Sequence, residues 1–384
     1  MRETLSSVQE QSGLRNRPSF DKQKPSMEYA ASSNESCLPI QTVLLTLRTL
    51  NDGLLLPWIS PALRGMVLKP LRDHFCSLKG GREVALVTSP DLATSSQRVA
   101  MSTEKSVEDN NYCVGCTKNS TCPFGRVFEP DLNVIDPRLI RRNDSQGVRG
   151  ISIAADIIGD ESTQFGKQIA SSSGSKIGTR LFAIGRQSIE LLPIVIEAID
   201  AFGQSNGLGY QVPVKFAVEY STTTVVEQTL DHASLSLNTD TGTLPSVTIQ
   251  LVSPLLLKSC FQLGQLAPPT FQDLLSNSVR IVIRSMREYH DPKYLEMEVL
   301  TQFLAVAKDI AMSHHDLTPF TQGSISHRGE VNAKGYRERP LRGWLGNITY
   351  KDVPASYLPW LHWAGRFGIG SDRNRGAGLW RIGF

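Results

Sequence analysis

The sequence predicts an α+β fold of two tandem ferredoxin-like (RRM-like) β-α-β-β-α-β domains with insertions, one of which carries a cysteine cluster. The first observation is an internal repeat, because each half of the chain begins with a strand and a helix. The second is that each half continues with an apolar helix, Phe-Gly, a G-x-G turn and a strand, at Gly207 and Gly209 in one half and at Gly376 and Gly378 in the other. The third is an apolar content of 40%, which supports a packed core.

The composition predicts where the domains begin and end. We expect a disordered lead-in (1–38), an N-terminal ferredoxin-like domain with the cysteine insertion (39–220), a linker (221–244) and a C-terminal ferredoxin-like domain with a glycine-rich loop (245–384). The lead-in is polar and lacks the apolar segment of a secretory signal. No run reaches the roughly 18 apolar residues of a membrane-spanning helix. We therefore expect a cytoplasmic protein with no membrane partner.

In the first half, Ser60 is expected to cap a helix that has Pro61 at its first position and continues to Phe75. Helical spacing of apolar residues predicts a second helix over Ser188–Phe202. Residues 129–178 are expected to be loop-rich. The predicted strands are Thr42–Leu50, Arg180–Gly185 and Val212–Val218.

The second half repeats this order. Thr270-x-x-Asp273 resembles a capping box and opens a long helix. A further helical stretch is expected over Tyr294–His314. The remaining predictions are strands over Val247–Leu257, Arg342–Tyr350 and Leu379–Ile382, and a helix over Pro354–Phe367.

Four cysteines suggest a metal site. Cys113, Cys116 and Cys122 have the spacing C-x2-C-x5-C, and Cys76 at the end of the first helix is the natural fourth ligand. In a reducing compartment this spacing favours a metal over disulfides, and a structural zinc ion is the leading interpretation. The alternatives are unligated thiols and an iron–sulfur cluster. A catalytic zinc site is disfavoured because no histidine or acid near this spacing completes it.

Basic charge gathers at the C-terminal end. Residues 328–384 contain ten Lys and Arg against four Asp and Glu, a balance of +6, whereas the whole chain has +3. This concentration favours a nucleic-acid surface over the alternative of a solvated basic face. Within it, the loop Gly368–Gly378 offers backbone N–H groups and guanidinium groups that suit a phosphate. A dinucleotide fingerprint follows a strand and opens a helix, whereas this loop follows a helix and opens a strand.

This loop, G-I-G-S-D-R-N-R-G-A-G, resembles the C-terminal signature of the RAMP superfamily. Together with Leu63-Arg64-Gly65, the C-x2-C-x5-C-P-F-G-x-x-F block, Ile184-Gly185, Ser253–Lys258 and Gly343–Tyr350, it is similar to the CRISPR precursor-RNA-processing endoribonuclease family. The resemblance runs from Thr42 to the C-terminus. It implies binding of CRISPR repeat RNA, often a hairpin, and metal-independent cleavage in which the ribose 2′-OH attacks the adjacent phosphate. The cysteines would then be structural, and no cofactor would be needed for catalysis.

Such a reaction needs a general base and acid, for which histidine is well suited. His327 is the first candidate because it lies in a polar, basic stretch, followed by His74 and then His315; His362 is interpreted as a packed core residue. We expect Arg373 and Arg375 to contact RNA phosphates. The remaining RNA-binding candidates are the loop-shaping Gly368, Gly370, Gly376 and Gly378, and the basic Arg328 and Arg342. The alternative is that the loop only packs the two domains together.

Two functions remain open on these grounds. The first is an endoribonuclease that yields mature guide RNAs with a 2′,3′-cyclic phosphate and stays on the 3′ hairpin of its product. The second is a non-catalytic guide-RNA-binding RAMP subunit of a CRISPR effector complex. Either function predicts repeat RNA and other effector subunits as partners. A zinc-binding adaptor, the third reading, predicts no RNA affinity.

Overall fold

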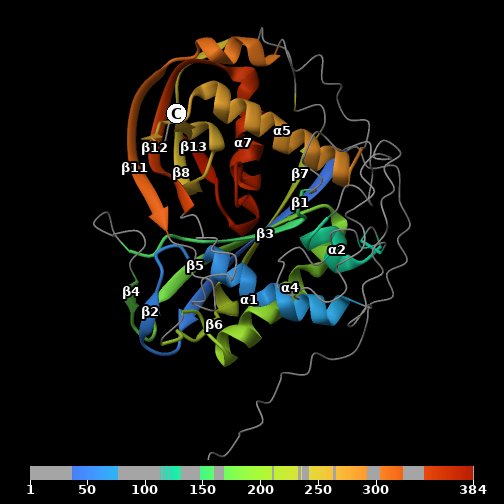
Figure 1. Cartoon of the computed structure of the whole chain (residues 1–384). Coiled ribbons are helices and arrows are strands. Elements are labelled where there is room, and N and C mark those ends of the chain that lie inside the picture. Colours follow the sequence, from blue (N-terminus) through green and yellow to red (C-terminus); the bar gives the residue numbers. More distant parts are fainter. Residues whose placement is uncertain are drawn as a thin grey trace, which may run out of the picture. The chain divides into compact units, whose positions relative to one another are not determined.

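The computed structural model describes the chain from Cys37 to Gly383 with gaps (Figure 1). The described residues are 37–76, 113, 116, 118–119, 121–130, 148–159, 168–209, 212–231, 235, 242–262, 265–291, 303–322 and 341–383. Asn34–Phe384 forms one compact unit. Nearly all of the predicted lead-in lies outside the described residues, and β1 already begins at Cys37.

The N-terminal half contains an antiparallel sheet with strand order β3-β5-β1-β6. Along the chain, the strands and the helices between them follow the order β1-α1-β3-β5-α4-β6, which is the ferredoxin-like arrangement. Their bounds are β1 Cys37–Thr49, α1 Ser60–Phe75, β3 Ile151–Ala155, β5 Lys176–Ile184, α4 Arg186–Ser205 and β6 Phe216–Val218. The additions are β2 Gly53–Leu55, paired with β4 Ile169–Ser171, the short helix α2 Pro123–Phe128, and β7 Thr224–Asp231.

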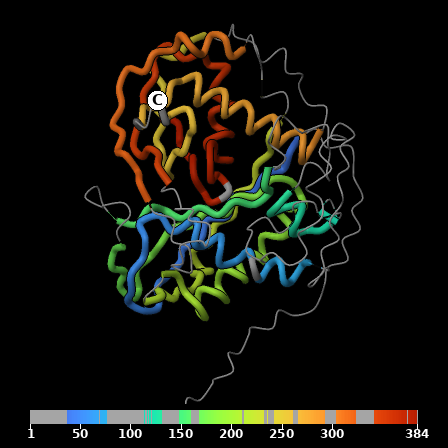
Figure 2. The backbone as a smooth tube through the Cα atoms, viewed as in Figure 1, coloured from blue at the N-terminus to red at the C-terminus, as the bar shows by residue number. Residues whose placement is uncertain are grey.

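The C-terminal half repeats this topology. Its sheet has the order β11-β12-β8-β13 and is antiparallel throughout, so the predicted tandem ferredoxin-like fold is confirmed. The bounds are β8 Thr243–Leu255, α5 Phe271–Tyr289, β11 Met312–Gln322, β12 Leu341–Pro354, α7 Leu358–Phe367 and β13 Trp380–Gly383, with a small hairpin of β9 Phe261–Gln262 and β10 Gln265–Leu266. Helices α5 and α7 contact each other and lie together beside this sheet (Figure 2).

Local sequence explains why α5 begins where it does. The Thr270 hydroxyl accepts a hydrogen bond from the Asp273 backbone N–H (3.1 Å), and an Asp273 carboxylate oxygen accepts one from the Thr270 N–H (3.3 Å). The predicted capping box is therefore present with Asp in place of Glu. Behind it, Phe271, Leu274 and Val282 are buried at helical spacing against the sheet.

Four local predictions differ from the structure. The Ser60 hydroxyl does not cap α1; instead it accepts a hydrogen bond from the Ala155 N–H of β3 (2.8 Å). The expected loop-rich region contains β3, and the expected linker contains β7, which pairs with β1. Residues 312–314 belong to β11 rather than to a helix. The three strands are stabilised by sheet pairing, which a local pattern does not reveal.

Apolar packing joins the two halves. Leu38, Ile40, Phe182 and Ile184 of the N-terminal sheet belong to the same buried cluster as the α5 and α7 side chains. The rings of Phe182 and Phe367 lie 5.3 Å apart. This packing places the end of α7, where the glycine-rich loop begins, against the N-terminal half. No helix in the described parts of the chain is long and apolar enough to cross a membrane.

Candidate nucleic-acid interface

The glycine-rich loop begins where α7 ends and is held by its own backbone. Gly368, Gly370, Gly376 and Gly378 all have positive φ, between 70° and 80°, as predicted for turn-forming glycines. Asp372 also has a left-handed φ of 57° and precedes a single 3₁₀ turn, Arg373–Arg375. The loop is therefore a defined turn that projects two arginines from one short helical segment.

Most of the loop's N–H groups are already bonded. Ser371 donates to the Leu256 carbonyl (2.8 Å), Arg375 to Asp372 (2.7 Å) and Gly378 to Pro254 (2.8 Å). Ile369, Gly376 and Ala377 likewise donate to carbonyl groups. Our expectation of consecutive exposed N–H groups is therefore wrong for these positions. Any anion at this loop would be bound mainly by side chains.

The loop packs against the first half of the chain. A Cβ atom added to Gly376 would lie 2.6 Å from the Ile153 carbonyl oxygen and 2.8 Å from the Ala154 Cα, both in β3. Ala377 is buried in a small cluster with Trp58 and Phe320, whose rings are 5.6 Å apart. The loop therefore does join the two halves, and this packing does not by itself decide whether its arginines also bind RNA.

Four arginines gather at this junction, and we call them the arginine cluster: Arg64 of α1, Arg149 before β3, and Arg373 and Arg375 of the loop. Both α1 and β3 contact the 3₁₀ turn of the loop. The acidic groups that act on Arg64 and Arg149 are Glu129 and Asp372. Arg375 pairs with Asp372 at 3.1 Å and is still 37% exposed. With four cations against these two carboxylates and Glu288, on which Arg373 acts, the cluster carries excess positive charge.

Arg64 is the most unusual member of the cluster. Its side chain is buried, and its Nη2 atom has no hydrogen-bond partner. Burial lowers the pKa of Arg64 well below its usual value, and the charge of Arg149 lowers it further. Burial also lowers the pKa of Arg149, which Glu129 partly offsets. A buried cation without full pairing is costly and commonly marks a functional site.

A second contact between the halves lies at the end of α5. The Val148 N–H donates to the buried carboxylate of Glu288, and the Arg126 guanidinium donates to the Glu288 backbone carbonyl. The Tyr289 hydroxyl donates to the Val148 carbonyl (2.6 Å). Burial raises the pKa of Glu288 to about 7, while Arg284, the Val148 N–H and then Arg373 oppose this rise. Arg373 therefore links this contact electrostatically to the loop.

The structure does not bring the candidate histidines together at the arginine cluster. His327 lies outside the described residues. His74 is half-buried near the C-terminal end of α1, about 15 Å along the helix from Arg64, and its ring packs edge-on to Phe75. His315 lies on β11, at the opposite edge of the C-terminal sheet from β13. Their catalytic roles remain predictions.

Other predicted residues are more scattered. Arg342 is exposed on β12, and Arg328 lies outside the described residues. His362 is exposed on α7, so our interpretation of it as a packed core residue is wrong. Sequence reasoning did not select Arg64 and Arg149 as site residues. The one signal for Arg64 was the Leu63-Arg64-Gly65 motif, which supported the family resemblance, and Arg149 had no such signal.

The four cysteines lie near one another, since Cys122, Cys116 and Cys76 all act on the Cys113 thiol. The Cys116 N–H donates to the Cys113 carbonyl (3.2 Å), which closes the C-x2-C turn. Nevertheless, among the described residues no group of three or more His, Cys, Asp or Glu side chains is arranged to hold a metal ion. The donor chemistry suits zinc but the arrangement does not close around one. The zinc site therefore stays a prediction.

Comparison with known families finds one match, in the second half of the chain. Residues 249–379 match the profile of the CRISPR-associated endoribonuclease Cas6 family. This part of the chain is similar to the Cas6 family. The match covers β8, α5, β11, β12, α7 and the glycine-rich loop, so the resemblance stated from the sequence is confirmed there. No curated protein matches the chain in sequence.

Solved Cas6 structures resemble the chain only distantly. Thermus thermophilus Cas6 (TTHB231) is 11% identical with a TM-score of 0.44, over 91% of this chain and 99% of that one. A Cas6-related gene product from Pyrococcus furiosus is 12% identical with a TM-score of 0.37, over 90% of this chain and 98% of that one. One chain of a partial Cas6-RT-Cas1–Cas2 complex is 11% identical with a TM-score of 0.43, over 90% of this chain and 46% of that one. Such values are too low to carry an inference about function.

Proposed function

We propose that the protein cleaves CRISPR repeat RNA into guide RNAs and that the arginine cluster holds the RNA backbone at the junction of the two halves. The carrying observation is the excess positive charge of this cluster next to a loop that belongs to the Cas6 family match. Guanidinium groups recognise phosphate through paired N–H donors, and they remain charged at neutral pH.

The chemistry that fits this site uses the RNA's own 2′-OH. Attack of the 2′-oxygen on the adjacent phosphorus forms a 2′,3′-cyclic phosphate, and breakage of the P–O5′ bond releases a 5′-OH. The half-exposed Arg373 and Arg375 would stabilise the negative charge that develops on the phosphate oxygens. A base must take the 2′-OH proton and an acid must protonate the leaving oxygen; His327, His74 and His315 are our candidates.

No step of this reaction uses a metal ion, which agrees with a structural role for the cysteines. We further propose that the enzyme acts in the cytoplasm and stays on the 3′ hairpin of its product. In that state it would contact other CRISPR effector subunits. The alternative is a RAMP subunit that binds guide RNA without cutting it, and this alternative predicts the same arginine contacts.

The test is a cleavage and binding assay in EDTA with labelled repeat RNA from the CRISPR array of the source genome. We expect cleavage that leaves a cyclic phosphate end. The double variant Arg373→Ala/Arg375→Ala should bind the repeat more weakly, with a salt slope smaller by about two, since each lost phosphate contact removes about one. Arg280→Ala, which removes an exposed arginine of α5, is the matched control and should bind like the unaltered protein.

The same assay separates the alternatives. Arg64→Met should weaken repeat binding without lowering the melting temperature, because exchanging a buried charge for an apolar side chain is often neutral or stabilising. Tight binding without cleavage supports the non-catalytic subunit. In that case there is no cleavage for His74→Ala, His315→Ala and His327→Ala to remove, and these variants need no test. Unchanged affinity and salt slope in the double arginine variant would falsify the proposed role of the cluster.

A further inference from the structure

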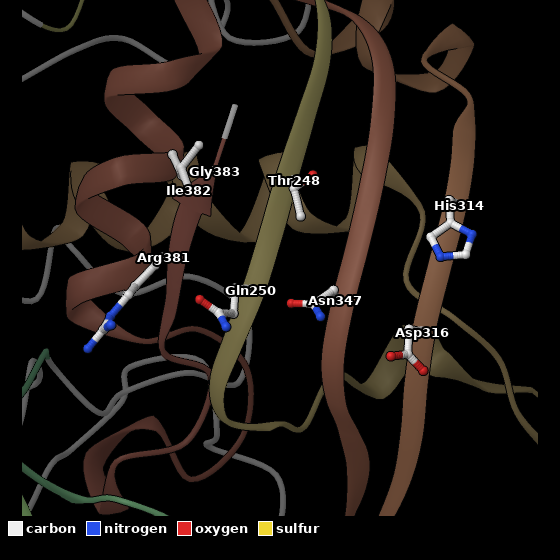
Figure 3. A pocket seen from close by; sticks show the side chains of 8 residues that line it. All are labelled: Thr248, Gln250, His314, Asp316, Asn347, Arg381, Ile382 and Gly383. Carbon is white, nitrogen blue, oxygen red and sulfur yellow. The ribbon is translucent and has the colours of Figure 1, made fainter.

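The C-terminal sheet has a pocket that the proposed reaction does not use. It has a volume of about 480 Å³, and eight residues from all four strands line it (Figure 3). They are Thr248, Gln250, His314, Asp316, Asn347, Arg381, Ile382 and Gly383. A volume of this size suits a small ligand or a single nucleotide.

Strand register explains why these side chains meet. Arg381 pairs with Gln250, Gln250 with Asn347, and Asn347 with Asp316, so one row crosses the whole sheet. A second row, two residues further along each strand, runs from Gly383 through Thr248 and Thr349 to His314. Directly opposite residues in neighbouring strands share a face. The two rows therefore form one polar surface, which we call the sheet-face pocket.

The surface is organised rather than randomly polar. Gln250 and Asn347 lie in the middle, with His314 and Asp316 on one side and Arg381 on the other (Figure 3). The hydroxyls of Thr248 and Thr349 are hydrogen-bonded to each other at 3.0 Å, which fixes the floor of the second row. Gln250, Asp316 and Arg381 are exposed and can reach a ligand.

Charge divides the pocket into two ends. At the β13 end, the exposed Arg381 is the cation among the lining residues. At the β11 end, the Asp316 carboxylate only accepts hydrogen bonds when ionised and repels a phosphate. A ligand with an anionic part and an amino-bearing part would therefore bind in one orientation, with the anionic part at the β13 end and the amino group at the β11 end.

We propose that the sheet-face pocket binds one unpaired nucleotide of RNA whose base carries an exocyclic amino group, with adenosine as the best fit. Arg381 takes the phosphate, the amides of Gln250 and Asn347 pair with the base edge, and Asp316 accepts from the amino group. Asn and Gln side chains form paired hydrogen bonds with adenine in this way. Uracil has no exocyclic amino group, and its one base-edge donor, the ring N3–H, lies between two carbonyl oxygens that the carboxylate repels.

This site differs from the usual single-strand platform on such sheets, where aromatic side chains stack on the bases. None of the eight lining residues is Phe, Tyr or Trp, and the His314 imidazole is the one aromatic ring among them. Recognition therefore comes mainly from hydrogen bonds, and these discriminate between bases more strongly than stacking does. The inference rests on the proposed function only in taking RNA as the ligand, and it places a second contact away from the arginine cluster.

The test measures binding of fluorescent eight-nucleotide oligoadenylate and oligouridylate to the full chain. We expect the unaltered protein to prefer oligoadenylate by about tenfold. Asp316→Ala should remove this preference by weakening oligoadenylate binding and not oligouridylate binding. Arg381→Ala should weaken both oligonucleotides alike and lower the salt slope by about one.

Gln272→Ala/Arg280→Ala is the matched control, because it removes an amide and a guanidinium from exposed positions of α5 instead of the sheet. It should leave both affinities unchanged. Equal binding of the two oligonucleotides by the unaltered protein, or an unchanged preference in Asp316→Ala, overturns the proposal. If either of these results is found while repeat RNA is still cleaved, the proposal for the sheet-face pocket is wrong and the proposed function stands. If repeat RNA is neither bound nor cleaved, the proposed function itself is wrong.

Discussion

The two G-x-G turns occupy the same place in the two halves and are used differently. In the first half, a Cβ added to Gly207 would lie 2.6 Å from the Val214 carbonyl oxygen, and one added to Gly209 would lie 2.7 Å from that of Leu54. Both neighbours belong to the same half. In the second half, Gly376 approaches β3 of the other half just as closely. One turn closes its own domain, whereas the other joins two domains.

This difference shows how one backbone turn serves two purposes. The glycines meet the same requirement in both places, namely a left-handed backbone next to another chain segment. Only the second turn has arginines between its glycine pairs, and only there do α1 and β3 of the other half supply neighbouring charge. The halves therefore share a topology, and the candidate interface arises from what is placed between them.

The largest effect should come from the cysteine segment, which only the first half carries. If the predicted zinc is bound, purified protein contains one zinc ion per chain. When the free zinc concentration is a thousand times the dissociation constant, bound zinc adds about 4 kcal/mol to the free energy of unfolding, and chelation removes this contribution. Metal analysis and thermal unfolding with and without chelator check this. A zinc-free protein whose melting temperature chelator does not change would contradict the metal assignment.

The next effect compares the two turns directly. Gly376→Ala should destabilise the protein by about 3 kcal/mol, combining left-handed strain with a clash against the Ile153 carbonyl. Gly207→Ala should cost about as much for the same reasons, but only Gly376→Ala should also weaken repeat RNA binding. Urea unfolding and the binding assay measure the two effects.

The matched control for both turns is Gly174→Ala, where φ is 84° and no atom lies within 4 Å of the added Cβ. It should cost only the backbone strain, about 1 kcal/mol. If Gly376→Ala were no more destabilising than this control, close packing of the loop on β3 could not be what joins the halves there.

The smallest effect concerns pH and the contact at the end of α5. Because the folded-state pKa of Glu288 is raised to about 7, the folded protein holds a proton that the unfolded chain has already lost above its ordinary pKa of 4.5. Stability should therefore fall by about 2 kcal/mol between pH 5 and pH 7 through this group. Glu288→Gln should flatten this part of the profile in urea unfolding. A variant profile parallel to that of the unaltered protein would remove Glu288 from this role.

Much of the fold could be predicted because its signals are local. The capping box at Thr270, the amphipathic α4 and the positive-φ glycines each depend on a few neighbouring residues. Strands β3 and β7 could not be predicted in this way. Residues Thr224–Asp231 are mostly exposed in β7, so they lack the alternating burial of an ordinary strand, and pairing with β1 holds them.

The candidate site was predictable only on its C-terminal side. Arg373 and Arg375 are conspicuous between glycines, whereas Arg64 resembles an ordinary polar position of a helix. What distinguishes Arg64 is burial next to a loop from the far end of the chain, and no local pattern encodes that contact. The sheet-face pocket is equally non-local, because its rows exist only once four strands are in register.

The long first strand has a consequence for synthesis of the protein. One side of β1 pairs with β5, and the other pairs with β6 near its end and with β7 from Cys37↔Asp231 to Leu44↔Thr224. Contacts between residues so far apart in sequence form slowly, because a long loop must close first. The N-terminal sheet therefore cannot be completed until β7 has left the ribosome, and the arginine cluster must wait for the last residues of the chain. A nascent or prematurely terminated chain would have no assembled interface with which to engage RNA.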